Sequence, residues 1–214
     1  MISVSDMIKL ENLSVKHGVS KIKLMEHAGR GLFLKMNEKY DLHRNKVLIL
    51  CGSGNNGGDG FVLAKYLIKS GCDCKILFLG NVEKLKKESQ FNYWMLKEKN
   101  ENIFLQMDYY DKIINNYQII VDAILGTGVK GNIREPYSSI IDYINSSSAT
   151  VVAVDIPTGI DPETGYILDK ITRFDIIYTF HDIKLGLKRY QDKVEIIDIG
   201  IPKEAIDEFE KTKS

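Results

Sequence analysis

The sequence predicts an α/β fold in which helices cover both faces of a mostly parallel β-sheet. Short apolar runs alternate along the chain with segments of helical periodicity. The strand runs are continuously apolar, which is typical of strands that are buried on both faces. At 214 residues the chain suits one sizeable domain better than two, so we expect residues 1–214 to form a single domain.

Helix and strand signals alternate through the first 100 residues. Apolar residues recur at helical spacing over residues 5–40, where Gly18 separates two helices and Ser20 is a suitable N-cap for the second. Beyond them a strand, a helix and a second strand predict a right-handed parallel crossover. The elements expected after residue 40 are a strand at 47–51, a helix at 61–69, a strand at 72–80 and a charged helix at 83–99. We expect the aromatic residues Phe91 and Trp94 of that charged helix to lie in the core, because no basic groove accompanies them.

The rest of the chain continues the alternation. Its expected elements are a weak strand at 103–105, a short helix at 111–116, a strand at 118–121, a helix at 138–144, and strands at 150–154, 174–180 and 194–199. Ile201 and Pro202 are expected to end the last strand, because proline cannot donate to a strand ladder.

Composition and charge exclude several classes of partner. Lys plus Arg and Asp plus Glu both number 29, so no overall field favours nucleic acid or an anionic membrane. No run approaches the roughly 20 apolar residues that span a bilayer, and the N-terminus does not resemble a signal peptide. We therefore expect a soluble, cytoplasmic protein that binds neither nucleic acid nor membranes.

The three cysteines are expected to be reduced thiols. Cys72 and Cys74 are spaced to share one face of a strand, but no second cysteine pair or nearby histidine completes a zinc site. Cys51 ends a predicted strand and is expected to be buried in it, and no histidine is placed to activate the hydroxyl group of Thr158. We find no nucleophile paired with a base.

The stretch from Gly52 to Gly60 is the first candidate for a binding site. Five of its nine residues are glycine, and it lies between a predicted strand and a predicted helix. Glycine permits close backbone approach, so successive N–H groups can point at one anion near a helix N-terminus. We interpret the stretch as distinct from the G-x-G-x-x-G dinucleotide fingerprint and from the P-loop, whose Lys-Ser/Thr ending it lacks. Taken alone, it is also compatible with a simple tight turn.

Polar, glycine-bearing turns follow three of the predicted strands, at residues 55–59, 122–132 and 155–161. Ligands of parallel sheets bind beyond the carboxyl ends of the strands, so these turns are expected to form one crevice. Asp155 stands where a carboxylate can meet the substrate, and there it would transfer a proton or orient a hydroxyl group.

The oxygen-bearing residues Asn56, Asp122 and Thr158 in these turns favour a hard cation over zinc or copper. Neutral ligands mixed with carbonyl groups suit a monovalent ion better than magnesium. Glu26 and His27, in the second predicted helix, either lie on a solvated face or border a pocket.

Six segments together carry a family resemblance. They are LMEHAGRGL, GSGNNGGDGFVLAKYL, VDAILGTGVKG, VVAVDIPTGIDPETG, TFHDIKLGL and DIGIP, in this order between about Met7 and Pro202. The set resembles the YjeF N-terminal domain family, the NAD(P)H-hydrate epimerases. The resemblance implies a three-layer αβα Rossmann-like sandwich, usually a homodimer. It also implies an isomerase of nicotinamide-nucleotide repair that interconverts the R and S epimers of hydrated NADH and NADPH.

The resemblance also implies the site residues. Those that would bind the hydrated dinucleotide are Asn55, Asn56, Gly57, Gly58 and Asp59, the loop Gly126, Thr127, Gly128, Val129, Lys130, Gly131 and Asn132, and Asp155. A potassium ion would be held by Asn56, Asp122 and Thr158, the last of which replaces the usual serine and keeps its hydroxyl group. Glu11 stands where the family usually has aspartate, a departure expected to affect the pocket rim or a dimer surface.

For catalysis we hypothesise that Asp155 acts as acid and then as base. Lys184 would assist it, although this lysine is also compatible with a phosphate contact or a plain surface position. Many bacterial relatives fuse this domain to an ADP- or ATP-dependent dehydratase. Because the chain ends at Ser214, we expect the dehydratase that acts with it to be a separate polypeptide.

Two alternatives remain at this point. One is a non-catalytic dimeric scaffold or ligand-binding module of the same fold, against which the presence of Asp122, Asp155 and the Asn-Asn-Gly-Gly-Asp turn counts. The other is a generic nucleotide-binding oxidoreductase, against which we count both the lack of a G-x-G-x-x-G fingerprint and the lack of an acidic partner for a ribose.

Overall fold

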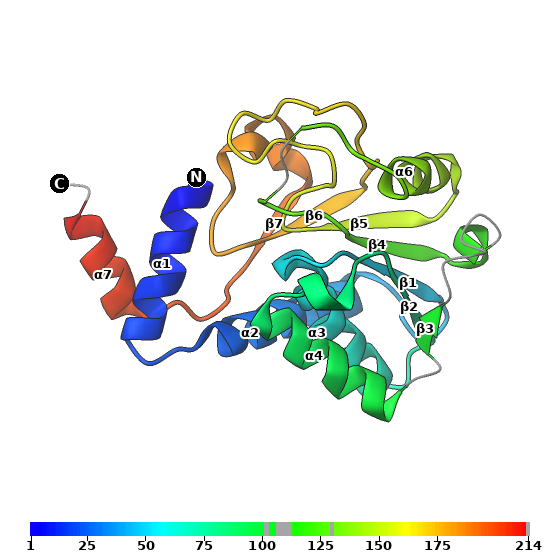
Figure 1. Ribbon diagram of the computed structural model, residues 1–214, viewed down its shortest axis with the longest axis horizontal. Helices are drawn as coiled ribbons and strands as arrows, with labels where there is room; N and C mark the ends of the chain where they lie inside the picture. The colour runs from blue at the N-terminus through cyan, green and yellow to red at the C-terminus, as the bar shows by residue number, and fades with distance from the viewer. Residues whose placement is uncertain (101–102, 106–112, 129–130, 213–214) are drawn as a thin grey trace.

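The computed structural model describes residues 1–100, 103–105, 113–128 and 131–212. Within these residues a seven-stranded sheet lies between layers of helices (Figure 1), which confirms the predicted α/β sandwich. The strands are β1 (Val47–Cys51), β2 (Cys74–Phe78), β3 (Phe104–Leu105), β4 (Ile119–Ala123), β5 (Thr150–Val154), β6 (Ile176–Phe180) and β7 (Val194–Ile197). The α-helices are α1 (Val4–Lys16), α2 (Lys21–Lys39), α3 (Asn55–Lys69), α4 (Lys87–Lys99), α6 (Tyr137–Ser146) and α7 (Lys203–Lys211). Short 3-10 helices are η1 (Val82–Lys84), η4 (Ile114–Asn116) and η5 (Leu185–Lys193).

The strand order places a binding crevice at the centre of the sheet. The order is β3-β2-β1-β4-β5-β6-β7, and each neighbouring pair is parallel. The chain runs outward in one direction from β1 and in the other from β4, so the topological switch point lies between these two strands. Ligands of open α/β sheets bind beyond the carboxyl ends of the strands at this point.

Strand β1 shows why the apolar runs are continuous. Its residues Val47, Ile49 and Cys51 pack in the core that includes residues of α2, α3 and α4, whereas Leu48 and Leu50 pack with residues of α6. All five are fully buried. Because alternate side chains meet helices on opposite faces, every position of the strand must be apolar.

The N-terminal helices begin and end as the sequence predicts. Ser3 Oγ accepts a hydrogen bond from Asp6 N at 3.0 Å and caps α1, and Ser20 Oγ accepts one from Lys23 N at 3.3 Å and caps α2. Between them Gly18 has a φ of +89°, a conformation that glycine adopts without strain. The chain therefore turns sharply between the two helices at this residue.

Helix α3 begins at Asn55, not at residue 61 as predicted. The glycine-rich stretch supplies the first turns of this helix and is only partly a loop. Glycine inside a helix costs roughly 1 kcal/mol relative to alanine. For this reason the helix was predicted to begin only after the glycines. Here the cost is offset because these glycines allow close packing, as described below.

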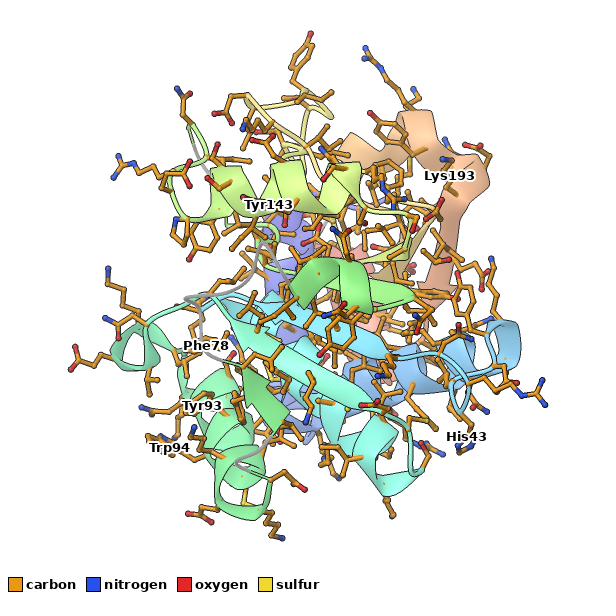
Figure 2. All side chains as sticks on the ribbon, turned by 90° about the vertical axis from the view of Figure 1, so that its right-hand side faces the viewer. His43, Phe78, Tyr93, Trp94, Tyr143 and Lys193 are labelled. Carbon is orange, nitrogen blue, oxygen red and sulfur yellow. The ribbon has the colours of Figure 1, made fainter. Side chains whose placement is uncertain are left out.

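The prediction for the core face of α4 was wrong. Phe91 is 49% exposed and Trp94 is 48% exposed, whereas Tyr93 is buried and packs against the ring of Phe78 with centroids 5.3 Å apart (Figure 2). Residues 89, 92, 93 and 96 have helical spacing and form the buried face. Residues 91, 94 and 95 have the same spacing, so periodicity alone could not decide between the two faces.

Two C-terminal elements were not predicted, namely η5 and α7. Helix α7 lies beside α1 away from the sheet (Figure 1), where Glu208 accepts from Lys16 Nζ at 2.6 Å. Residues 111 and 112 of the predicted short helix lie outside the described residues. No helix in the described part of the chain is long and apolar enough to cross a membrane. Cys51, Cys72 and Cys74 are free and buried.

Candidate active site

A pocket of about 1030 Å³ lies at the switch point, beyond the carboxyl ends of β1, β4 and β5. Residues of α1 and α2 close it from the opposite side. Ten of the residues predicted to bind substrate or act in catalysis line it, namely Asn55, Asn56, Asp59, Gly126, Thr127, Gly128, Gly131, Asn132, Asp155 and Lys184. Its volume is at the upper end of the roughly 300–1,000 Å³ of ordinary ligand sites, so it can admit a large ligand.

Other predicted residues lie elsewhere. Gly57 and Gly58 do not line the pocket, and Asp122 and Thr158 are fully buried beneath it. Val129 and Lys130 lie outside the described residues.

Gly57 and Gly58 serve close packing of α3. A Cβ atom on Gly57 would lie 2.0 Å from Gly52 O, and one on Gly58 would lie 2.6 Å from Met25 Cε. Gly52 itself is pressed against the carbonyl group of Ile124, where a Cβ would lie 1.9 Å away. These contacts hold the N-terminus of α3, with its unpaired N–H groups, against the loop after β4.

The stretch from Gly52 to Gly60 was interpreted as distinct from the dinucleotide fingerprint, but the spacing of its glycines does match that fingerprint. Gly52, Gly54 and Gly57 do follow the G-x-G-x-x-G pattern, and they lie in the strand–turn–helix context that the pattern requires. What differs is the end of β2, where Leu79, Gly80 and Asn81 offer no acidic side chain to a ribose.

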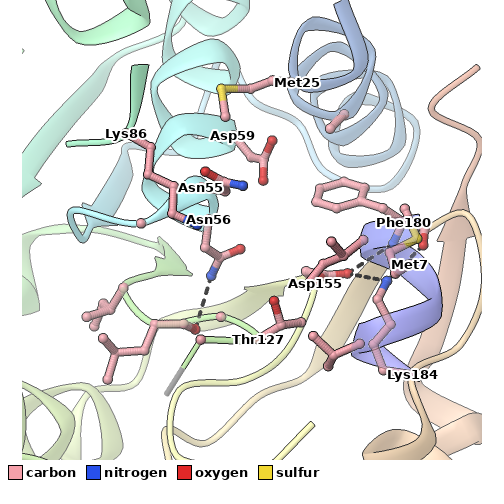
Figure 3. A pocket seen from close by; sticks show the side chains of 18 of the residues that line it. Met7, Met25, Asn55, Asn56, Asp59, Lys86, Thr127, Asp155, Phe180 and Lys184 are labelled. Carbon is pink, nitrogen blue, oxygen red and sulfur yellow. Dashed lines mark hydrogen bonds and ion pairs between the residues drawn. The ribbon is translucent and has the colours of Figure 1, made fainter. Parts of the chain in front are cut away.

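Asp155 and Lys184 form a buried ion pair at one side of the pocket (Figure 3). Lys184 Nζ donates to Asp155 Oδ1 at 2.7 Å and to Phe180 O at 2.8 Å. Thr179 Oγ1 and Phe180 N also donate to Asp155 Oδ1, at 3.0 and 3.2 Å. No described residue donates to Asp155 Oδ2, which leaves this oxygen for a ligand. Lys184 is 1% exposed, so its interpretation as a plain surface lysine was wrong.

The backbone at Asp155 is held in an unusual conformation. Its φ is +60°, in the left-handed region that costs most residues roughly 1–2 kcal/mol. Such conformations persist where the surroundings fix them, and they occur often at functional sites. Here the turn follows β5 directly and directs the carboxylate toward Lys184.

Asp59 reaches the pocket from the second turn of α3. It is 8% exposed, and no hydrogen bond or ion pair joins its carboxyl group to another described residue. Burial raises the pKa of Asp59 well above its usual value, and the nearby carboxylates of Asp155 and Glu11 add to the effect while Lys184 opposes it. Burial also raises the pKa of Glu11, which lines the same pocket.

The three predicted cation ligands are linked by hydrogen bonds, two of which run through the backbone of Leu125. Asn56 Nδ2 donates to Leu125 O at 3.2 Å, and Leu125 N donates to Thr158 Oγ1 at 3.1 Å. Asp122 accepts from Thr158 N at 2.8 Å, from Thr158 Oγ1 at 2.7 Å and from Thr172 Oγ1 at 2.5 Å. Burial raises the pKa of Asp122, and these hydrogen bonds oppose the rise.

Asn56 Oδ1 is the one buried side-chain oxygen or nitrogen without a hydrogen-bond partner among the described residues. An unpaired buried acceptor costs roughly 1–3 kcal/mol unless a ligand satisfies it. The donor set around it consists of amide, carboxylate, hydroxyl and carbonyl oxygens, which suits a hard cation. The residues present therefore fit the predicted cation, which Asn56, Asp122 and Thr158 would hold.

The chain matches the family model described as YjeF-related protein N-terminus over residues 21–186. It belongs to this family. The matched range includes the glycine-rich start of α3, the Asp122 network and the Asp155–Lys184 pair. The match therefore spans most of the segments that line the pocket, but not the residues of α1.

Relatives of similar length carry one name. The chain is 38% identical to the NAD(P)H-hydrate epimerase of Nitrosopumilus maritimus, covering 95% of this chain and 97% of that protein. It is 37% identical to the NAD(P)H-hydrate epimerase of Cenarchaeum symbiosum over the same shares. It is also 40% identical to the bifunctional NAD(P)H-hydrate repair enzyme of Methanothermobacter thermautotrophicus, covering 86% of this chain but only 37% of that enzyme.

The fold has a solved counterpart. The crystal structure of the yeast protein ynu0 superimposes with a TM-score of 0.77, covering 90% of this chain and 85% of the yeast chain at 22% identity. At this identity the likeness supports the fold alone.

Several site residues were missed because no local pattern marks them. Thr172 and Thr179 lie far from Asp122 and Asp155 in sequence and meet them only in the folded chain. Lys86 lines the pocket beside Asn55 and Asn56 (Figure 3), although the sequence indicated only a position in the charged helix predicted at 83–99.

Glu26 and His27, whose role was left open, do not line the pocket. Glu26 pairs with Lys65 and accepts from Tyr66 Oη at 2.6 Å, and His27 Nδ1 lies 2.8 Å from Ile199 O.

Proposed function

We propose that this protein is an NAD(P)H-hydrate epimerase, an isomerase that interconverts the R and S epimers of hydrated NADH and NADPH. The observation that carries the proposal is the large pocket at the switch point of the sheet. The family of the chain, and its relatives of similar length named NAD(P)H-hydrate epimerase, support this reaction. The relatives' names give no support to the alternative of a non-catalytic scaffold. The activity belongs to nicotinamide-nucleotide repair.

The two sides of the pocket suit two parts of the substrate. On one side are Asn55 and Asn56 at the N-terminus of α3, with Lys86 from the start of α4 beside them, so that N–H groups and a lysine favour phosphate oxygens there. On the other side are Asp155, Lys184 and Phe180 (Figure 3). We therefore propose that the diphosphate lies against α3 and the glycine loop 126–132, and that the hydrated nicotinamide ring lies near Asp155.

The chemistry requires proton transfer at one carbon. Carbon 6 of the hydrated ring carries a hydroxyl group and is bonded to the ring nitrogen. Protonation of the departing hydroxyl and electron release from nitrogen give an iminium ion, to which water can add on either face. Asp155 Oδ2 is free to exchange a proton with the entering or leaving water, and Lys184 holds the carboxylate in place.

We propose that Asn56, Asp122 and Thr158 bind a monovalent cation, potassium being the candidate. The support is the unpaired Asn56 Oδ1 together with an all-oxygen donor set. A bound cation would offset the charge of Asp122 and fix the loop that begins at Leu125.

Assembly and cellular context remain proposals. The family resemblance suggests a homodimer, whose mass can be measured by light scattering after gel filtration. The bifunctional relatives support a metabolic partnership with a dehydratase that consumes the S epimer. The boundaries 1–214 for a single domain, and a cytoplasmic location, stay predictions.

A coupled assay tests the function. A mixture of R and S hydrates is incubated with a dehydratase specific for the S epimer, and the recovery of coenzyme absorbance is followed. The S portion is consumed first, so the slow remainder reports epimerisation. We expect the folded protein with potassium to accelerate this remainder over the spontaneous rate. A rate equal to the spontaneous one, with and without potassium, would contradict the proposed function.

A further inference from the structure

Asp59 occupies a position in the pocket that packing does not explain. Its side chain is more than nine-tenths buried, yet it has no hydrogen bond or ion pair with any described residue. Figure 3 shows its carboxyl group directed from α3 into the open space that Asp155 faces from the other side. Polar groups in a protein interior are nearly always paired within the protein; the carboxyl group of Asp59 instead meets only the open pocket that it lines, so it is suited to act on a ligand.

The charged groups around Asp59 favour its acid form. Glu11 faces it from α1 and Asp155 from the turn after β5, and both are carboxylates. The thiol of Cys51 on β1 is also nearby, and burial raises the pKa of that thiol. Lys184 is the opposing cation, but its charge is already paired with Asp155 at 2.7 Å. The dipole of α3 favours an anion mainly within its first turn, which ends before Asp59.

Asp155 has the opposite environment. Three donors, one of them the ammonium group of Lys184, converge on Asp155 Oδ1. These donors hold the carboxylate in place and leave its Oδ2 atom open to the pocket. The two carboxyl groups therefore face one cavity from different elements and with different partners, an arrangement that lets them take different roles.

We propose, resting on the proposed function, that Asp59 is a second catalytic carboxyl group. It protonates the C6 hydroxyl on one face of the ring, while Asp155 accepts the proton of the water that adds to the opposite face. This replaces a single carboxyl group acting twice with two groups acting once each.

The step balances in atoms and electrons. The C6–O bond breaks with both electrons on oxygen, which leaves as water with the proton from Asp59. The lone pair of the ring nitrogen forms a C=N bond. A water molecule then bonds to C6 from the side of Asp155 and gives its proton to that carboxylate, and the C=N electron pair returns to nitrogen. Asp59 ends ionised and Asp155 ends protonated, which is the form that carries out the reverse epimerisation.

The experiment measures kcat and KM against pH in the coupled assay with potassium. The variants are Asp59→Asn, which keeps shape but cannot donate an acid proton, and Asp59→Glu, which keeps the carboxyl group. Asp73→Asn is the matched control, because Asp73 is exposed at the start of β2, at the other end of the strands from the pocket.

We expect Asp59→Asn to lower kcat by about 100-fold or more with little change in KM, since positioned proton transfer contributes about that much. Asp59→Glu should retain part of the rate, and Asp73→Asn should match the wild type. The wild-type rate should fall on the alkaline side as Asp59 loses its proton, and the residual rate of Asp59→Asn should lack this fall.

Two results overturn the inference without touching the proposed function. One is a folded Asp59→Asn protein with wild-type kcat. The other is a loss that lies wholly in KM, which would make Asp59 a binding residue only. A wild-type protein that gives no acceleration would instead remove the proposed function and this inference together. Circular dichroism verifies folding, and Asp59→Ala replaces Asp59→Asn in the comparison if the latter does not fold.

Discussion

Lys184 Nζ lies 2.7 Å from Asp155 Oδ1, with the lysine side chain 1% exposed and the aspartate side chain 15% exposed. An ammonium group buried to this degree is tolerated only when it is paired and hydrogen-bonded. Lys184 meets this condition through Asp155 and through the carbonyl group of Phe180. The stability of the fold and the position of the proposed proton acceptor therefore depend on the same pair.

Lys184→Met should destabilise the protein by about 3–5 kcal/mol, because it leaves the carboxylate of Asp155 without its buried partner. Combining it with Asp155→Asn should recover part of the loss, giving a coupling energy of about 1–3 kcal/mol. Urea unfolding of the wild type, the two single variants and the double variant measures this coupling. Strictly additive effects would show that the two side chains do not depend on each other.

Asp59→Asn should be more stable than the wild type at neutral pH. The pKa of Asp59 is raised in the folded protein, so the folded state binds the proton more tightly than the unfolded state does. The wild type therefore loses stability as the pH rises from the ordinary aspartate range near 3.8 toward the raised folded value. An uncharged asparagine avoids this loss. Thermal melting of both proteins from acidic to neutral pH should show a difference that grows with pH; equal melting temperatures throughout would count against it.

Asp122→Asn should destabilise the protein by about 1–3 kcal/mol. Both oxygens of Asp122 accept hydrogen bonds from N–H and O–H groups. The amide group of an asparagine would place its own N–H groups against some of these N–H and O–H donors. Denaturant unfolding measures the effect, with the exposed Asp73→Asn as a control expected to change stability little. Wild-type stability in Asp122→Asn would mean that this hydrogen-bond network contributes nothing.

Potassium should raise the melting temperature of the wild type, and Asn56→Ala should remove most of this increase. A ligand that binds only the folded state stabilises it by about 2.7 kcal/mol at 100 times its Kd. Melting curves in potassium chloride, compared with choline chloride at equal ionic strength, separate specific binding from screening. The proposed site would be refuted by an equal potassium effect in Asn56→Ala, or by none in the wild type.

Gly57→Ala should destabilise the protein by more than about 2 kcal/mol, whereas Gly54→Ala should cost about 1 kcal/mol or less. A Cβ atom on Gly57 would lie 2.0 Å from the carbonyl oxygen of Gly52, which cannot move without shifting the loop. A Cβ on Gly54 meets nothing within 4 Å, and its φ is negative. Chemical denaturation of this matched pair tests whether the glycines act through packing. Equal losses would contradict that reason.

The sheet was predictable because its strands are marked by short continuous apolar runs such as residues 47–51. The start of α3 was missed because helix propensity counts glycine as a cost, while the close approach of Gly57 to Gly52 is a tertiary contact. The buried face of α4 was missed because two sets of residues on that helix have the same helical spacing.

The site was predictable where one loop carries the chemistry and unpredictable where distant segments meet. Asn55, Asn56 and Asp59 come from a single recognisable glycine-rich stretch. The contact between Asp122 and Thr172 joins residues 50 positions apart, and no spacing rule anticipates it. Nor does any local pattern indicate that Asp59 is left without a partner.

The glycines before and within the start of α3 affect how tolerance to substitution should be interpreted at this site. Gly52 and Gly57 would reject almost any replacement in a large substitution library, and selection for coenzyme repair would rank them with the chemically active positions. The same two positions would fail equally in a screen for soluble expression. Asn55 and Asp59 would pass that screen and fail only the selection. Comparing the two screens would separate residues that shape the pocket wall from residues that act on its contents.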